Sequence, residues 1–289
     1  MNQQWQMPVP KNLVSAEPTP YRLYVCSARI KPEAGSQLKN TFDKGIPLAG
    51  DLENTYNQHL VYTHHLGDTY FEAGPSADFT EILYIFSTEN MAEAQTTLRN
   101  DPLFKSGIIY EDSWFTWEIH SPRWKIAANF READEKFLYS AGLLPQYPPE
   151  IKQSIGEIIV DNITPPRLFA CFSKMNRGIL NQWLSPHSKT ASVVMVQHVY
   201  NCAGQGGAGS MGYHWLSGPS VDYTLDLSIF SVNSLFMAQL IKENDSFSRY
   251  GIFYDFRYFE WCIHMPFRKA SPQHKETLKR LMEKAGIKV

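Results

Sequence analysis

The chain has 289 residues, of which 43% are hydrophobic, 19% charged and 13% aromatic, and its formal net charge is −2. Because it carries no basic block and no run of about 18 apolar residues, the composition argues against a nucleic-acid-binding or membrane-spanning protein. The length fits about two domains of ordinary size. The first twenty residues lack the charged and apolar regions of a signal peptide, and the four cysteines form no CxxC motif. We therefore expect a cytoplasmic location.

In chain order, a polar arm at residues 1–20 precedes a first structural repeat at residues 21–142. Runs of branched and aromatic residues predict strands, and apolar residues at helical spacing predict helices. The expected elements of this repeat are a strand at 22–27, a helical region around Leu60, strands at 69–73 and 81–87, a helix at 91–99 and a long aromatic strand at 107–119. The proline-containing residues 143–165 then connect it to a second repeat at residues 166–289.

The second repeat has the same order of elements. We expect a strand at 167–173, a helical region around Val194, strands at 213–217 and 225–231, a helix at 235–242, a last strand at 251–263 and a closing helix from Ser271. Residues 74–142 reappear at 218–286 with a constant shift (218 − 74 = 144) and without a gap. Trp117 stays in register with Trp261. The chain therefore contains two copies of one backbone.

The order of elements in each copy, β-α-β-β-α-β, is that of the ferredoxin-like split βαβ motif. A single four-stranded sheet of this kind has one face covered by helices and one bare apolar face. Two copies can bury their bare faces against each other. We therefore predict an α+β fold of two tandem ferredoxin-like repeats that form a pseudo-dimeric α+β barrel.

A family resemblance rests on residues 73–124, AGPSADFTEILYIFSTENMAEAQTTLRNDPLFKSGIIYEDSWFTWEIHSPRW. This stretch contains a Gly-Pro followed shortly by aspartate, an acidic second-helix segment, a DPF-like turn, a glycine and a closing aromatic strand. A helix with a histidine precedes it. The stretch resembles the YCII-related (YciI-like) family, and the second repeat shows a weaker version. The resemblance implies a dimeric α+β barrel, small-molecule chemistry and a histidine–aspartate dyad.

The dyad that the resemblance implies pairs the helix histidine with the aspartate after Gly-Pro. These residues are His59 with Asp78 in the first copy and His198 with Asp222 in the second. An aspartate bonded to one imidazole nitrogen raises the basicity of the other, which can then move a proton near neutral pH. Another interpretation places the histidine on a helix surface and uses the aspartate to cap a turn. The first copy keeps the family's spacing more closely, so we favour it as the active one.

Aromatic side chains of the last strands are predicted to line a substrate cavity between the sheets. They are Trp114, Trp117, Tyr258 and Trp261. Residues 204–209 match GxGxxG, but no helix is expected after them, so we interpret them as a loop or lid. The neighbouring His64 and His65 diverge by about 100° on a helix, which argues against a shared metal ion. His120 and His264 both precede the proline that ends a last strand, where strand capping or packing at the seam between copies is expected.

These features favour an enzyme, a cofactor-independent lyase or isomerase that uses the histidine–aspartate dyad to move a proton on a small carbonyl, lactone or phenolic compound. A non-catalytic protein that binds a small hydrophobic ligand in the same cavity is the alternative. A haem-binding barrel is a weaker alternative, since haem enzymes also occur on α+β barrel folds. We expect no cofactor and no metal. The expected partner is a small-molecule substrate rather than nucleic acid or a membrane. The sequence does not decide whether the protein forms a homodimer.

Overall fold

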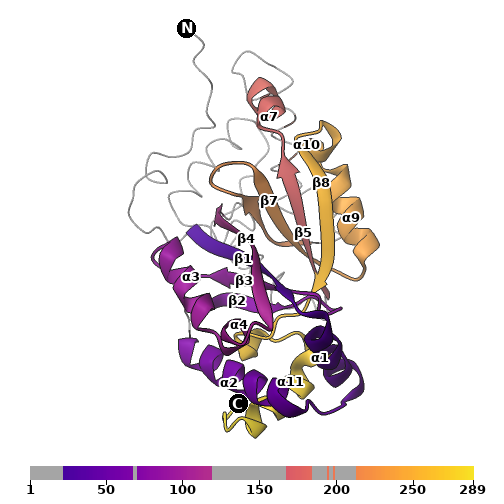
Figure 1. The fold of residues 1–289 in the computed structure, drawn as a ribbon. Coiled ribbons are helices and arrows are strands. Elements are labelled where there is room, and N and C mark those ends of the chain that lie inside the picture. The colour runs from indigo at the N-terminus through magenta and orange to yellow at the C-terminus, as the bar shows by residue number, and fades with distance from the viewer. Residues whose placement is uncertain (1–21, 68–69, 119–166, 184–193, 195–197, 199–212) are drawn as a thin grey trace, which may run out of the picture. The chain divides into compact units, whose positions relative to one another are not determined.

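The computed structural model describes residues 22–67, 70–118, 167–183, 194, 198 and 213–289 (Figure 1). These residues fall into two compact units. The N-repeat unit consists of Arg22–Thr116 and Glu260–Val289, and the C-repeat unit takes its described residues from Trp117–Phe259. The predictions for the N-terminal arm, the linker, the glycine-rich segment and His120 lie outside the described residues.

The N-repeat sheet has the strand order β2-β3-β1-β4. Its strands are β1 (Arg22–Ile30), β2 (Tyr70–Pro75), β3 (Glu81–Phe86) and β4 (Ile109–Glu118). β1 pairs antiparallel with β3 in a register that places Cys26 opposite Tyr84, and β2 pairs antiparallel with β3 as well. The central strand β3, EILYIF, is buried along its whole length, as its branched and aromatic residues predict. The four predicted strands of the first repeat are confirmed.

The helices of the first repeat are α1 (Pro32–Lys44), α2 (Gly50–Leu66), α3 (Met91–Asn100) and α4 (Pro102–Lys105). The sequence predicts one helical region between the first two strands, whereas the structure has two helices, α1 and α2. α1 has a proline in its first turn and ends at Gly45, whose φ is 69°, and both are common helix boundaries. Its residues Leu38 and Phe42, one turn apart, face the core.

The C-terminal segment, Glu260–Val289, belongs to the N-repeat unit, although the sequence repeat assigns it to the second copy. Its first residues run antiparallel to β2, where the Cys262 N–H donates to the Pro75 carbonyl oxygen over 2.9 Å. At Gly74, a Cβ atom would lie only 1.9 Å from the Cys262 carbonyl oxygen. Only glycine allows two backbones to approach so closely, which explains the glycine of the Gly-Pro motif.

The predicted closing helix is confirmed as α11 (Pro272–Lys284), which follows a short 3-10 helix, η4 (Phe267–Lys269). α11 packs against α1 and α2 (Figure 1). Leu278 and Met282, one turn apart, are buried in the same hydrophobic core as the residues of β1 and β3. In the part of the chain that the structure describes, no helix is long and apolar enough to cross a membrane.

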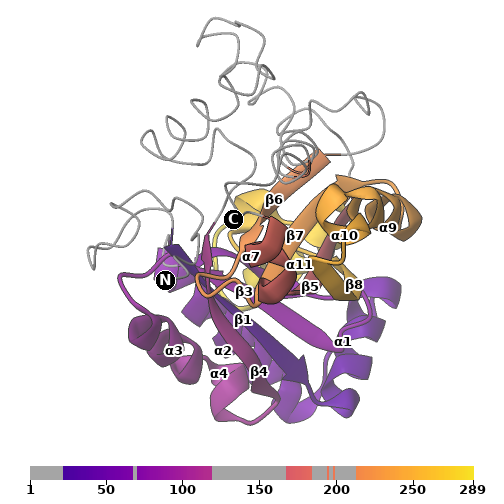
Figure 2. The same cartoon turned by 90° about the horizontal axis from the view of Figure 1, so that it is seen from above.

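The C-repeat sheet repeats the topology, with the strand order β6-β7-β5-β8. The elements of the second repeat are β5 (Arg167–Met175), α7 (Arg177–Trp183), β6 (Tyr213–Pro219), β7 (Leu225–Val232), α9 (Leu235–Asn244), α10 (Ser246–Arg249) and β8 (Phe253–Trp261). Cys171 lies opposite Ser228, as Cys26 lies opposite Tyr84, and α9 packs on β5 and β7 (Figure 2). The α+β fold of two ferredoxin-like repeats is confirmed. The packing of one sheet on the other stays a prediction.

Two tryptophans occupy equivalent places at the ends of the last strands. Trp117 and Trp261 are both 0% exposed. In the C-repeat unit, Trp117 Nε1–H donates to the Gly218 carbonyl oxygen over 2.7 Å, and in the N-repeat unit, Trp261 Nε1–H donates to that of Gly74 over 3.0 Å. Each indole therefore binds the glycine of a Gly-Pro motif, which explains why tryptophan recurs in register.

Candidate active site

Helix α2 supplies the first polar side chains of the candidate site. Tyr56, His59 and Thr63 are spaced by three and four residues, so they lie on one face of the helix. All three are buried, together with Leu52 and Leu60. His59 is therefore held inside the N-repeat unit, as its predicted chemical role requires, and does not lie on the helix surface.

Asp101 holds the imidazole of His59. His59 Nδ1 lies 2.9 and 2.8 Å from the two carboxylate oxygens of Asp101, and Asp101 is fully buried. Asp101 is also the N-cap of α4, where its carboxylate accepts from the Leu103 N–H over 2.8 Å. Because the backbone positions the carboxylate, the imidazole is held with Nδ1 as the donor, and Nε2 becomes the basic nitrogen.

Asp78, the predicted partner of His59, lies in a turn. Its carboxylate accepts hydrogen bonds from Ser76 Oγ over 2.6 Å and from Thr80 Oγ1 over 2.9 Å. Burial raises the pKa of Asp78, but these hydroxyls and nearby backbone N–H groups outweigh burial and lower the pKa below 3.8. The carboxylate stabilises a turn in which Phe79 has a φ of 57°, a conformation that is unfavourable for a bulky residue. The pairing of His59 with Asp78 is therefore wrong.

The sequence carried a signal that could have identified Asp101 as a partner of the histidine. Asp101 recurs as Asp245 (245 − 101 = 144) and begins the DPF-like turn of both copies. It does close the preceding helix, since α3 ends at Asn100. A carboxylate has two oxygens and several acceptor sites, so it can cap a helix and still accept from a side chain. An aspartate that recurs directly before a short helix was thus a second candidate partner for the histidine.

His59 lines a small cavity in the N-repeat unit. Its volume is about 30 Å³, and its polar side chains are those of Tyr56, His59, Thr63, Tyr84 and His264, while the rest of the wall is largely apolar. A water molecule needs about 10–15 Å³, and a typical ligand pocket measures about 300–1,000 Å³. The cavity therefore has room for one or two water molecules or for the reacting end of a small compound.

A pair of histidines from the C-terminal segment adjoins Tyr56. The Tyr56 hydroxyl lies 3.4 Å from His264 Nδ1, and His264 Nε2 lies 2.9 Å from His274 Nδ1. Both imidazoles pack on Phe42, with ring centroids 4.7 and 4.8 Å away. Burial and the neighbouring imidazoles of His274 and His59 lower the pKa of His264 well below 6.5, and burial lowers the pKa of His274 to about 4. Both histidines are therefore neutral at pH 7.

Sequence reasoning placed His264 at a strand end or at the seam between the copies, and it did not single out Tyr56 or His274. Tyr56 had a usable signal, because it lies three residues before His59 on the same predicted helix. His264 follows His59 by 205 residues (264 − 59 = 205). No local pattern connects residues that are so far apart.

The C-repeat unit contains a counterpart of the His59–Asp101 pair. His198 Nδ1 lies 2.9 Å from Asp245 Oδ1, and Asp245 caps α10 by accepting from the Phe247 N–H over 2.8 Å. The His198 ring stacks on the Phe247 ring with centroids 3.8 Å apart. Burial raises the pKa of Asp245, but His198, Lys242 and the Phe247 N–H outweigh burial and lower the pKa to about 2.

Asp222, the predicted partner of His198, stabilises a turn like that of the equivalent aspartate in the first repeat. It accepts from Ser220 Oγ over 2.6 Å and from Thr224 Oγ1 over 2.8 Å. The pairing of His198 with Asp222 is therefore wrong as well. The matching of His198 with His59 is supported, because both bond to the aspartate that caps a short helix.

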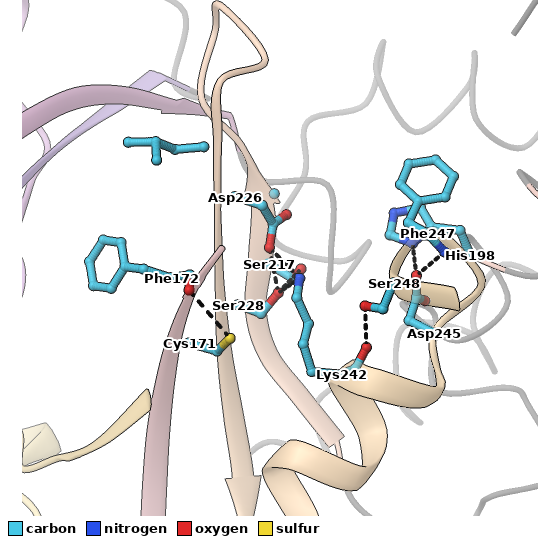
Figure 3. A network of polar contacts seen from close by, with 12 residues as sticks. Cys171, Phe172, His198, Ser217, Asp226, Ser228, Lys242, Asp245, Phe247 and Ser248 are labelled. Atoms are coloured by element: carbon cyan, nitrogen blue, oxygen red, sulfur yellow. Dashed lines mark hydrogen bonds and ion pairs between the residues drawn. The ribbon is translucent and has the colours of Figure 1, made fainter. Parts of the chain in front are cut away.

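A buried ion pair distinguishes the interior of the C-repeat unit. Lys242 extends from α9 to Asp226 and Ser228 on β7 (Figure 3), and its Nζ atom lies 2.5 Å from Asp226 Oδ2 and 3.0 Å from Ser228 Oγ. The same Nζ lies 3.6 Å from the centroid of the Phe253 ring. Burial lowers the pKa of Lys242, but the Asp226 charge and other nearby acidic groups outweigh burial and raise it above 10.5. Lys242 is therefore charged at pH 7.

The equivalent positions in the N-repeat unit are apolar. Asp226 corresponds to Ile82 (226 − 144 = 82), and Lys242 corresponds to Leu98 (242 − 144 = 98). Ile82 lines the cavity beside His59, and Leu98 is fully buried. Two charged residues in one copy thus replace an apolar pair in the other.

The four aromatic residues that were predicted to bind substrate do not line the cavity beside His59. Trp117 and Trp261 are core residues that hydrogen-bond to glycine carbonyl groups. Trp114 packs on Phe86 with ring centroids 5.6 Å apart, and Tyr258 packs on a hydrophobic cluster from β5, β7 and α9. The observed contacts are packing contacts within each unit, so a role in substrate binding stays a prediction.

His64 and His65 are exposed side chains on α2, with ring centroids 6.0 Å apart. Among the residues that the structure describes, no group of three or more histidine, cysteine, aspartate or glutamate side chains is placed to hold a metal ion. The two histidines are therefore a surface pair.

The similarity of this chain to known proteins is limited to the fold. No family model matches the chain, and no curated protein matches it in sequence, so the YCII-related resemblance stays a prediction. A mutant chlorite dismutase from Candidatus Nitrospira defluvii is similar over 93% of this chain and 99% of its own, with a TM-score of 0.53 and 10% identity. Another mutant, in complex with cyanide, is similar over 96% of this chain and 100% of its own, with a TM-score of 0.52 and 10% identity. At this identity the likeness shows the fold alone, an α+β fold with two antiparallel sheets and helices.

Proposed function

We propose that the N-repeat unit is a cofactor-independent lyase or isomerase in which His59 moves a proton on a small carbonyl, lactone or phenolic compound. The observation that carries this proposal is the His59–Asp101 pair at the wall of a cavity. His59 Nδ1 lies 2.8 Å from a buried carboxylate oxygen, so Nε2 is the nitrogen available to a bound molecule. Proton transfer by a positioned imidazole typically contributes about 10²–10⁴-fold to a reaction rate.

The role of Asp101 follows from its charge. When His59 takes a proton from carbon, the imidazole becomes a cation, and the adjacent carboxylate stabilises that cation. The largely apolar wall of the cavity lowers the local dielectric constant, so the attraction is stronger than in water. The proton can return to another atom of the substrate, which is an isomerisation. A leaving group can instead depart from the neighbouring carbon, which is an elimination.

Hydrogen–deuterium exchange tests the proposal without a known substrate. Small ketones, lactones and phenols are incubated with the protein in D₂O, and NMR follows the loss of the C–H signal next to the oxygen-bearing carbon. His59→Asn should lower the exchange rate about 10²–10⁴-fold while the circular dichroism spectrum stays the same. His65→Asn removes an exposed imidazole of the same helix and should leave the rate unchanged. Equal rates for the wild type and His59→Asn, or no exchange with any compound, would overturn the proposal.

A non-catalytic binding protein is the second candidate, and the largely apolar wall of the cavity favours it. A binding protein does not require a base, so it should tolerate asparagine at position 59. Calorimetric titration with small apolar compounds separates the two candidates. A ligand that binds the wild type and His59→Asn equally well, without any exchange of its protons, would identify a binding protein.

A haem-binding barrel is the third candidate, and the His198–Asp245 pair favours testing it. The cavity of about 30 Å³ beside His59 is far smaller than a porphyrin, so that site does not fit haem. His198 fits the donor chemistry, because a metal-bound histidine usually donates its second ring nitrogen to a carboxylate. Haem bound there would supply redox chemistry. Titration of the protein with haemin, followed by absorbance, tests this candidate, and His198→Ala should abolish a specific Soret shift.

A further inference from the structure

We propose that Tyr56 is a second catalytic residue of the N-repeat cavity, where it protonates the substrate oxygen while His59 removes a proton from the adjacent carbon. His264 and His274 resupply the proton of Tyr56. This inference rests on the proposed function, because it assigns the acid that accompanies the base. It narrows the substrate class to compounds with a carbonyl oxygen next to an acidic C–H bond, such as small ketones and lactones.

Tyr56 and His59 are placed to contact neighbouring atoms of one small molecule. They lie one turn apart on the same face of α2, their ring centroids are 5.6 Å apart, and both line the cavity. Burial and the charge of Asp101 raise the pKa of Tyr56 above its usual value of 10.0. The phenol therefore stays protonated and acts as a hydrogen-bond donor, which a developing enolate oxygen needs.

The surroundings of His264 and His274 differ from those of His59. Among the described residues, no carboxylate bonds to either imidazole; His264 contacts Tyr56 and His274 instead. His59 also faces His264. The histidines therefore suit different tasks. His59, which bonds to a carboxylate, accepts a proton, and the neutral His264–His274 pair passes a proton on.

The outer end of this chain of groups borders charged side chains. His274, on α11, faces Asp43, Glu260 and Lys39. Lys39 and Asp43 lie on α1 with 44% and 39% of their side chains exposed. A proton can therefore reach His274 from water beside α1 and leave the relay at Tyr56, inside the cavity.

The protons and electrons of the step balance. Tyr56 O–H donates to the substrate oxygen, His264 Nδ1–H donates to the Tyr56 oxygen, and His274 Nδ1–H donates to His264 Nε2. His59 Nε2 takes the proton from carbon, the C–H electron pair forms a C=C bond, and the C=O π pair moves to oxygen, which takes the Tyr56 proton. His264 then reprotonates Tyr56, His274 reprotonates His264, and water protonates His274 at Nε2 and leaves as hydroxide, which takes the proton back in the return step. In the return step the enol gives its proton back along the same path while His59 protonates carbon.

The two links of the relay differ in length. The His264–His274 distance of 2.9 Å is that of a normal hydrogen bond, whereas the Tyr56–His264 distance of 3.4 Å is long. Catalytic hydrogen bonds are often long in ligand-free structures and shorten when the substrate binds. The Tyr56–His264 link, next to the cavity, is therefore the one that must shorten when a substrate binds.

Matched tyrosine variants test the proposal in the D₂O exchange assay. Tyr56→Phe removes the hydroxyl and keeps the ring. Tyr62→Phe is the control, because Tyr62 lies on the same helix and its hydroxyl donates to the Thr97 carbonyl oxygen over 2.8 Å, outside the cavity wall. We expect Tyr56→Phe to lower kcat about 10²–10³-fold with little change in KM, and Tyr62→Phe to leave both unchanged. His274→Gln should lower kcat by a smaller factor, because it acts only through His264.

NMR of the imidazole nitrogens provides a readout that does not depend on turnover or on the folding of one variant. Tyr56→Phe and His274→Gln should each shift the nitrogen resonances of His264, and Tyr62→Phe should not. Unchanged His264 resonances in both variants would overturn the relay.

The outcomes for the two proposals are distinguishable. If His59→Asn abolishes exchange while Tyr56→Phe leaves kcat unchanged, the assignment of Tyr56 fails and the proposed function stands. If neither variant changes the exchange rate, both fail.

Discussion

The two repeats hold the same histidine–aspartate pair on the same backbone, but their interiors differ. In the N-repeat unit, the residues Ile82 and Leu98 are apolar, and a cavity of about 30 Å³ remains beside the histidine. In the C-repeat unit the equivalent residues are Asp226 and Lys242, which bond to each other over 2.5 Å. A buried ion pair is stable only when both charges are well hydrogen-bonded. In the C-repeat unit, Asp226, Lys242 and Ser228 bond to one another, so these polar groups hold the interior together. In the N-repeat unit the cavity therefore leaves space beside the histidine–aspartate pair, which a ligand needs.

The residue that contacts the histidine also differs between the units. His198 stacks on Phe247 with centroids 3.8 Å apart. The equivalent of Phe247 is Leu103 (247 − 144 = 103), which lines the cavity together with His59. A smaller side chain at this position leaves one side of the imidazole next to the cavity. Matched variants of the two repeats therefore separate a chemical role of the first repeat from a structural role of the second.

The largest expected effect follows from changing the aspartate of each pair. Asp101→Asn keeps a residue that can cap α4, but its amide can present N–H to His59 Nδ1 and so favour the wrong tautomer. We expect the exchange rate to fall about 10²–10⁴-fold, measured by NMR in D₂O. Asp245→Asn, the matched change in the second repeat, should have a smaller effect. Equal losses from both changes would remove the chemical distinction between the repeats.

Removing one charge of the buried ion pair should destabilise the protein strongly. Lys242→Leu leaves the Asp226 carboxylate buried without its cation, and we expect the free energy of unfolding to fall by about 3–5 kcal/mol. The double variant Asp226→Ile with Lys242→Leu recreates the apolar pair of the first repeat, Ile82 and Leu98. It should be neutral or more stable than the wild type by about 1–4 kcal/mol. Urea unfolding measures both, and a double variant as unstable as the single one would contradict the equivalence of the two interiors.

The equivalent tryptophans should contribute similarly to stability in both repeats. Trp117→Ala and Trp261→Ala each remove a fully buried indole and its hydrogen bond to a glycine carbonyl. We expect each to lower the free energy of unfolding by about 3–5 kcal/mol. Tyr110→Ala, at a side chain that is 51% exposed, is the control and should change it by about 0.5 kcal/mol or less. A melting temperature unchanged by either tryptophan replacement would show that the indole is not a core residue.

The neutral histidine pair should make the N-repeat unit sensitive to acid. The pKa of His274 is lowered from 6.5 to about 4 by burial, so the unfolded chain binds more protons between these pH values. This contribution to stability is complete above pH 6.5, is lost as the pH falls toward 4, and amounts to about 3 kcal/mol. Urea unfolding at pH 7 and pH 4.5 measures the loss. His274→Gln should show a weaker pH dependence, and an unchanged dependence would assign the acid sensitivity to other groups.

The smallest expected effect concerns the aspartates of the Gly-Pro turns. Asp78→Ala and Asp222→Ala remove hydrogen bonds from Ser76 and Ser220, and we expect each to cost about 1 kcal/mol of stability. Chemical denaturation measures this cost in either repeat. Asp78→Ala should leave the exchange rate close to that of the wild type. A loss as large as that of His59→Asn would restore Asp78 as a member of the site.

The sequence by itself determined the repeat, the order of the strands and the two equivalent histidines, His59 and His198. A constant shift of 144 residues and the alternation of strand and helix patterns predicted both sheets, because strands and helices follow local periodicity and turn residues. The sequence also predicted that His59 lies on a helix, but whether this histidine is buried or on the surface was decided only by the structure. Helix α1 was missed although Pro32 and Gly45 carried ordinary boundary signals.

Only the tertiary structure decided which groups meet around His59. Asp78 and Asp101 follow His59 by 19 (78 − 59 = 19) and 42 residues (101 − 59 = 42), and spacing cannot choose between them. The choice depends on how α4 begins beside α2, where Asp101 binds the imidazole and the helix end together. His264 reaches the cavity because the C-terminal segment pairs with β2. Local periodicity sets the face on which a side chain lies, but a hydrogen bond depends on distances of a few ångströms between elements that are remote in sequence.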